Sequence, residues 1–175
     1  VIDSLNVSLA ESLMVIRANA LKDKGNSYEE VVESIEEFKH HINVQFTVDD
    51  LFHLQRGGRI SKTSAIVGSA LNLKPLLYIS AAGTLSTAGT VRGRKKSLHA
   101  LVEKMKATLE ENTDYSLPVG IVHGNCLEDA QVVAELVKEQ TQFQDIIIND
   151  ISPSIGTHAG PGALGILYYG QPRKE

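Results

Sequence analysis

Residues 117–148 read LPVGIVHGNCLEDAQVVAELVKEQTQFQDIII, and this stretch decides the expected fold. Its two ends, 117–123 and 143–148, are short apolar runs of the kind that form buried strands. Between them, residues 128–139 carry apolar side chains at helical spacing. The side chains that form this stripe are Ala130, Val133, Ala134 and Val137. A strand, a helix and a second strand in this order predict an α/β fold.

The segments on either side extend the alternation. Residues 74–79 and 85–91 read as two strands, and Ala82-Gly83-Thr84 between them reads as a tight turn. Together they predict a β-hairpin. Because a hairpin pairs its strands antiparallel, we expect a mixed β-sheet with flanking helices. Further helical segments are expected at 4–24, from Ser27, and at 49–54, 61–71 and 94–110, and further strands at 44–48 and 163–169.

The composition is that of a globular chain of 175 residues, with 42% hydrophobic and 22% charged residues. The formal net charge of −4 argues against a general nucleic-acid binder, because phosphate backbones attract basic faces. A single cysteine, Cys126, leaves no disulfide framework and no cysteine-based zinc site, so a cytoplasmic setting is the default expectation. No apolar run reaches the roughly 18 residues of a membrane span. No metal or cofactor is expected.

Residues 154–165, SIGTHAGPGALG, place His158 among glycines and just before the apolar run 166–169. A histidine is a donor, an acceptor and a potential cation near neutral pH. Glycines allow a tight backbone turn and the close approach of a ligand. The segment therefore indicates either a polar corner at the end of a buried strand or a plain glycine-rich turn with a surface histidine.

Three other loops carry polar side chains, and each has two interpretations. Arg56-Gly57-Gly58-Arg59 precedes a predicted helix. It is either an anion site, which free N–H groups at a helix start and an arginine would suit, or an ordinary turn. Residues 92–96 hold four cations at a helix start. They either dock an acidic partner or a phosphorylated ligand, or they simply form a solvated face. His123-Gly124-Asn125 follows the C-terminal end of a strand, where α/β sheets bind ligands, or it is a simple turn.

Catalytic motifs are missing from the sequence. It contains no Gly-x-Ser-x-Gly elbow, no His-Glu-x-x-His motif and no prominent pair of loop carboxylates. The lack of a chemical centre favours binding over turnover, so we do not expect an enzyme.

Taken in order, six segments resemble the DegV family. They are VIDS (1–4), LFHLQRGGRI (51–60), LNLKPLL (71–77), VRGRKK (91–96), HGN (123–125) and IGTHAGPG (155–162). The last segment is the most specific, and the match runs along essentially the whole chain. The resemblance implies the C-terminal portion of a two-lobed α/β protein, with the tail of the first lobe in residues 1–48 and the second lobe in residues 49–175.

The resemblance also implies a function. DegV proteins are bacterial cytoplasmic proteins that bind a long-chain fatty acid in a buried tunnel, with the carboxylate near the lobe interface. In some members a partner fatty acid kinase phosphorylates the bound acid to an acyl phosphate for phospholipid synthesis, and the binding protein contributes no catalysis. His158 matches the family histidine beside the carboxylate, and Gly156, Gly160 and Gly162 would give the head group room.

Basic and apolar residues complete the implied site. Arg59, Arg92 and Arg94 lie in the stretches that form the basic surface at the pocket mouth, where a kinase would dock. Each methylene of a buried acyl chain contributes about 0.8 kcal/mol, so a long apolar lining suits a fatty acid. The apolar side chains that suit such a tunnel, or alternatively belong to the core, are Leu71, Leu76, Ile79 and Ile166, with Leu73, Leu77 and Leu167.

One departure from the family and two alternative functions remain. Family members have a further part before Asp3-Ser4, with Thr-Ser and Ser-Gly loops that bind the carboxylate, and this chain lacks those loops. We therefore expect the isolated chain to bind long-chain fatty acids weakly or not at all.

One alternative is an enzyme or regulator that binds a phosphorylated small molecule through Gly57-Gly58-Arg59. The other is a protein-interaction lobe that docks an acidic face through residues 92–96.

Overall fold

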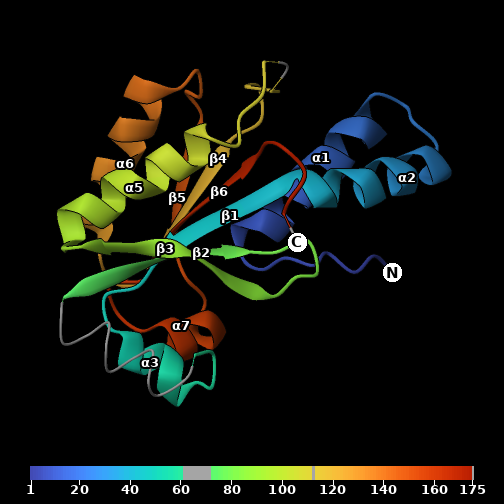
Figure 1. The fold of residues 1–175 in the computed structure, drawn as a ribbon. Helices are drawn as coiled ribbons and strands as arrows, with labels where there is room; N and C mark the ends of the chain where they lie inside the picture. Colours follow the sequence, from blue (N-terminus) through green and yellow to red (C-terminus); the bar gives the residue numbers. More distant parts are fainter. Residues whose placement is uncertain (61–71, 112, 175) are drawn as a thin grey trace.

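The computed structural model describes residues 1–60, 72–111 and 113–174, which form one six-stranded sheet with helices on both faces (Figure 1). The helix expected at 61–71, and Leu71 with it, lies outside the described residues. The strands are β1 (Ile42–Thr47), β2 (Leu73–Ile79), β3 (Leu85–Arg92), β4 (Val119–His123), β5 (Ile146–Asp150) and β6 (Leu164–Tyr169). The helices are α1 (Leu9–Asp23), α2 (Tyr28–Phe38), the short 3₁₀ helix η1 (Lys39–His41), α3 (Leu51–Arg56), α5 (Arg94–Lys106), α6 (Leu127–Gln140) and α7 (Pro153–Ala159).

The strand order is β3-β2-β1-β6-β4-β5. Neighbouring strands are antiparallel except for β4 and β5, which are parallel. The parallel pair is joined through α6, as a crossover requires, and the hairpin β2–β3 is antiparallel. The mixed α/β class predicted from the sequence is therefore confirmed.

Helices α5 and α6 cover one face of the sheet (Figure 1). The stripe predicted on α6 faces inward, since Ala130, Val133, Ala134 and Val137 are all buried. These side chains pack with Leu101 and Met105 of α5 and with strand residues from the centre of the sheet. The strand residues in this core include Leu76, Ile121, Ile166 and Tyr168.

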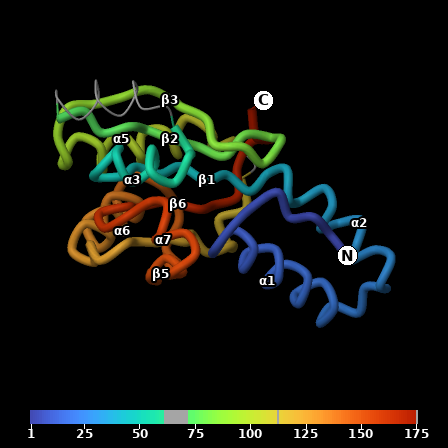
Figure 2. Tube along the Cα trace, turned by 90° about the horizontal axis from the view of Figure 1, so that it is seen from below, coloured from blue at the N-terminus to red at the C-terminus, as the bar shows by residue number. Residues whose placement is uncertain are grey.

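Helices α1 and α2 pack on the opposite face, side by side at one end of the molecule (Figures 1 and 2). α2 begins with the capping box that its sequence predicts, between Ser27 and Glu30. α1 begins at Leu9, later than expected, because Leu5 and Ser8 have positive φ angles of 51° and 61° that interrupt a helix. Among the described residues, no helix has both the length and the apolar character needed to cross a membrane.

β1 lies inside the sheet, between β2 and β6. The expected boundary between the two lobes, at residue 48, therefore falls directly after a strand that is shared with the rest of the sheet. The assignment of residues 1–48 to a first lobe stays a prediction.

Candidate functional site

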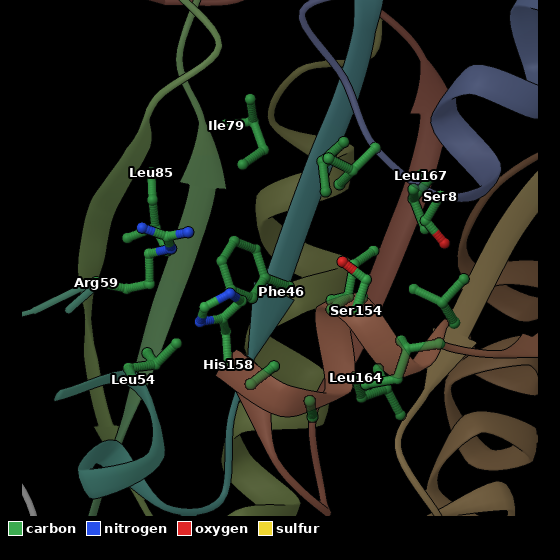
Figure 3. Close-up of a pocket in the computed structure, with 18 of the residues that line it drawn as sticks. Ser8, Phe46, Leu54, Arg59, Ile79, Leu85, Ser154, His158, Leu164 and Leu167 are labelled. Carbon is green, nitrogen blue, oxygen red and sulfur yellow. The ribbon is translucent and has the colours of Figure 1, made fainter. Parts of the chain in front are cut away.

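An apolar cavity of about 580 Å³ lies on the sheet face turned away from α5 and α6 (Figure 3). Its volume is within the range of about 300–1,000 Å³ that is typical of small-molecule pockets. The sheet supplies the floor of the cavity through Val44, Phe46, Val122 and Leu167. The walls come from the segment before α1, the β2–β3 hairpin, α3 and α7, through residues that include Val7, Ser8, Ile79, Leu85, Leu54 and Ile155.

Helix α7 presents His158 to the cavity. The side chain of Ser152 caps this helix by accepting a hydrogen bond from the N–H of Ile155 at 3.4 Å, and Pro153 occupies the first turn. Nδ1 of His158 is buried beside Gly57 and has no hydrogen-bond partner among the described residues. The residues of α7 that line the cavity are Ser154, Ile155, His158 and Ala159.

Arg59 follows the C-terminus of α3, which ends in a Schellman motif. The N–H of Arg59 donates to the carbonyl of Leu54 at 2.8 Å, the N–H of Gly58 donates to the carbonyl of Gln55 at 3.0 Å, and Gly58 has a φ of 69°. These N–H groups are occupied within α3, so the paired glycines do not form the anion cradle considered for this loop. The exposed side chain of Arg59 reaches the cavity beside His158 (Figure 3).

The glycines around His158 do not line the cavity, so their expected role beside a head group is corrected. A Cβ on Gly160 would lie 2.6 Å from Cγ of His53, and a Cβ on Gly162 would lie 2.6 Å from Cβ of Asp49. Both glycines also have positive φ angles, of 76° and 78°. They let the end of α7 and the following loop pack closely on the region of α3. Gly156 lies inside α7.

The candidate tunnel residues divide between the two faces of the sheet. Ile79 and Leu167 line the cavity. Leu76 and Ile166 instead belong to the core beneath α5 and α6, which corrects their expected place in a tunnel. The reason is the two-residue period of a strand, which sends Ile166 and its neighbour Leu167 to opposite faces.

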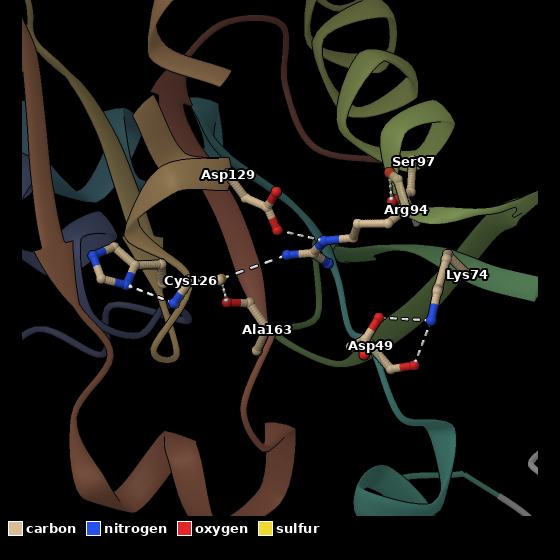
Figure 4. Close-up of polar contacts among 8 residues, drawn as sticks. Asp49, Lys74, Arg94, Ser97, Cys126, Asp129 and Ala163 are labelled. Carbon is tan, nitrogen blue, oxygen red and sulfur yellow. Dashed lines mark hydrogen bonds and ion pairs between the residues drawn. The ribbon is translucent and has the colours of Figure 1, made fainter. Parts of the chain in front are cut away.

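The expected basic surface is only partly available. Arg92 is exposed at the end of β3, but it does not line the cavity. Nε of Arg94 donates to Oδ2 of Asp129 at 2.8 Å, which joins α5 to α6 (Figure 4). The guanidinium of Arg94 is therefore engaged inside the fold and is not a free docking charge.

Polar contacts from the segment after β4 hold residues 160–163, the loop between α7 and β6 (Figure 4). The N–H of Gly124 donates to the carbonyl of Ala163 at 2.8 Å, and the N–H of Gly162 donates to the carbonyl of Gly124 at 2.7 Å. Sγ of Cys126 donates to the carbonyl of Ala163 at 3.4 Å, and burial raises the pKa of this thiol. The His123-Gly124-Asn125 loop thus supports the loop that follows α7.

An ion pair between the buried Lys74 and the exposed Asp49 holds the segment before α3. Nζ of Lys74 lies 2.6 Å from Oδ1 of Asp49 and donates to the backbone carbonyl of Asp49 at 2.9 Å. Within the part of the chain that the structure describes, no three His, Cys, Asp or Glu side chains are grouped to hold a metal ion. The cavity is therefore a largely apolar site with Arg59 and His158 on one side, suited to an amphipathic ligand that has an acidic end.

Comparison with known proteins gives relatives along the whole chain. The DegV family model, described as an uncharacterised protein of the DegV family, matches residues 1–171. The DegV domain-containing protein CPE0026 of Clostridium perfringens is 37% identical over 174 residues, which are 99% of this chain and 59% of that protein.

Solved structures share the fold. A DegV family protein from Ruminococcus gnavus with vaccenic acid is 29% identical, with a TM-score of 0.84 over 95% of this chain and 58% of that one. The Fatty Acid Kinase (Fak) B3 protein of Streptococcus pneumoniae, loaded with linoleic acid, is 30% identical, with a TM-score of 0.83 over 96% of this chain and 58% of that one. The chain spans about three fifths of the length of these relatives. It belongs to the DegV family.

Proposed function

We propose that this chain provides the acyl-binding cavity of a fatty-acid-binding protein, with the carboxylate of the ligand beside His158 and Arg59. The observation that carries the proposal is the apolar cavity of about 580 Å³ with these two side chains on one side. Each methylene that the floor residues bury contributes about 0.8 kcal/mol. Nε2 of His158 and the guanidinium of Arg59 supply donors for the carboxylate.

The chain binds its ligand and contributes no catalysis in this proposal. Support comes from the relatives with vaccenic and linoleic acid, whose structures cover nearly all of this chain. The alternative of a phosphorylated small molecule on Gly57-Gly58-Arg59 receives no support from the N–H groups of these three residues, because they donate to carbonyls of α3. The start of the helix expected at 61–71 lies outside the described residues.

A matched pair of histidine variants tests the site. His158→Ala removes the donor at the cavity, whereas His99→Ala removes an exposed histidine on α5, on the other face of the sheet. Calorimetry of the complete protein with a long-chain fatty acid is expected to show about tenfold or greater loss of affinity for His158→Ala, because a charge-assisted hydrogen bond is lost. His99→Ala keeps the wild-type affinity. Equal affinities for all three proteins would refute the assigned carboxylate site.

We further propose that the bound acid is presented to a fatty acid kinase, which phosphorylates its carboxylate to an acyl phosphate. The support is the similarity to the Fak B3 protein and the exposed cation Arg92. Arg92→Glu is expected to slow kinase-dependent phosphorylation of the bound acid without weakening its binding. Lys24→Glu, a charge reversal at the exposed C-terminal end of α1, serves as the control. If the acid bound to Arg92→Glu is phosphorylated as fast as the acid bound to the wild type, Arg92 is not part of the docking surface.

A further inference from the structure

The wall of the cavity before α1 is an irregular segment, residues 5–8, which we name the strap. Val7 and Ser8 of the strap line the cavity. Figure 3 shows Ser8 on the opposite side of the pocket from Arg59. A fatty acid that places its carboxylate beside His158 therefore extends its apolar tail towards the strap.

The strap is held in a conformation that its own residues do not favour. Leu5 and Ser8 have φ angles of 51° and 61°, in the left-handed region that residues with a side chain rarely adopt. Such a conformation persists only where surrounding contacts impose it. The contacts that hold the strap therefore decide where this wall of the cavity lies.

Arg173, far away in the sequence, supplies the long-range polar contacts of the strap, in addition to the local hydrogen bonds that Asp3 and Ser4 make with Leu5 and Asn6. Its Nη1 donates to the carbonyl of Leu5 at 2.9 Å and lies 3.4 Å from Oδ1 of Asn6, and only 7% of the residue is exposed. Within the strap, Asn6 is buried whereas Val7 is 45% exposed, so the strap is packed unevenly. The hydrogen bond from Nη1 to a backbone carbonyl is charge-assisted, whereas Nε and Nη2 of the same guanidinium have no partner among the described residues.

The residue after Arg173 extends the anchor to the hairpin. The carbonyl of Lys174 accepts a hydrogen bond from the N–H of Ala81 at 2.8 Å. Gly83 in the same turn packs against the strap, since a Cβ there would lie 3.4 Å from the carbonyl oxygen of Leu5. Gly83 and Thr84 also line the cavity. The C-terminal segment thus joins the strap to the hairpin turn, and these two elements meet at the cavity.

We propose that Arg173 is a positioning residue, which fixes the strap and thereby sets the length of acyl chain that the cavity accepts. The proposal rests on the fatty-acid function proposed above. In this proposal an acid long enough to reach the strap depends on this wall, whereas an acid too short to reach it does not. Arg173 itself does not line the cavity, so its substitution acts on the site indirectly, through the strap that its side chain holds.

Two measurements on the complete protein test this role, with Arg173→Met compared with Lys174→Ala. Lys174 is exposed and contributes its backbone carbonyl, so the alanine variant keeps the contact with Ala81. Hydrogen exchange without ligand is expected to be faster for the amides of residues 5–8 in Arg173→Met than in wild type or Lys174→Ala. Calorimetry is expected to show about tenfold weaker binding of octadecanoic acid by Arg173→Met, with dodecanoic acid unchanged. Arg173→Lys, which keeps one donor, restores part of the difference.

Each outcome decides one part of the proposal. Wild-type exchange rates at residues 5–8 in Arg173→Met would show that Arg173 does not anchor the strap, whatever the ligand. Equal weakening for both acids, or for neither, would show that the strap does not select chain length. If the wild-type protein binds neither acid, the proposed function fails together with the selection of chain length, whereas the exchange experiment still decides whether Arg173 anchors the strap.

Discussion

His158 lies where α7 meets the end of α3, and its ring packs directly on a glycine. A Cβ on Gly57 would lie 2.6 Å from Nδ1 of His158, and the φ of Gly57, −75°, is one that alanine adopts without strain. Gly57→Ala is therefore expected to displace the imidazole and to weaken fatty-acid binding about tenfold, with a small effect on stability.

Gly58→Ala is the matched control for this steric effect. A Cβ on Gly58 meets no described atom within 4 Å, but its φ of 69° strains an alanine, at a cost of about 1 kcal/mol. Calorimetry and urea unfolding of both variants are expected to separate the two effects, with binding reduced in Gly57→Ala and stability reduced in Gly58→Ala. Wild-type binding by Gly57→Ala would contradict the role given to the His158 ring.

Cys126 is expected to react slowly in the folded protein. Burial raises the pKa of its thiol, so the reactive thiolate is scarcer in the folded state than in the unfolded chain at neutral pH. Iodoacetamide is therefore expected to alkylate the native protein about tenfold more slowly than the urea-unfolded protein. The rate measured by mass spectrometry rises with pH in both states. Equal native and unfolded rates would show that the thiol is accessible and ordinary.

For single residues, the local sequence left the roles of His158 and Arg59 open between a ligand site and a plain turn. The resemblance to the DegV family selected both residues, and both lie at the cavity. For Leu76 and Ile166 the sequence left both the tunnel and the core open, because a buried strand is apolar on both faces and its pattern does not say which face lines a cavity; both residues lie in the core. Gly160 was misread because its close neighbour, His53, is distant in sequence.

The element that sequence reasoning missed is α7, which carries His158. Residues 153–159 were read as part of a glycine-rich turn, since Gly156 and Gly160 lower helix propensity. The signal that identifies the helix is Ser152 followed by Pro153, an N-cap and a proline in the first turn. By contrast, the stripes on α5 and α6 and the capping box of α2 are strong local patterns, and these helices were predicted.

The Ser152 cap of α7 is expected to contribute to stability and to binding. Ser152→Ala is expected to lower the free energy of unfolding by about 1 kcal/mol, because the N–H of Ile155 loses its partner. Fatty-acid binding weakens as well, since fraying of α7 moves His158. Ser12→Ala, which removes a serine hydroxyl inside α1 and leaves α7 untouched, is the control. Urea unfolding measures the difference, and equal stabilities of the two variants would mean that the cap contributes nothing.

For the whole molecule, alternation of strands and helices was enough to predict a mixed α/β sheet. The strand order was not predictable, because the pairing of β1 with β6 joins segments more than a hundred residues apart. That pairing creates the site, since it places Phe46 and Leu167 on one face, where the hairpin, α3 and α7 close over them. The cavity is thus a property of the complete sheet, and each local pattern supplies only one wall.

Native mass spectrometry of the complete protein purified from cells tests the central claim most directly. The proposed function predicts a bound species with the mass of a long-chain fatty acid, present in the wild-type protein and reduced in His158→Ala. A bound nucleotide or sugar phosphate in its place, or a fatty acid retained equally by the wild type and His158→Ala, would contradict the account.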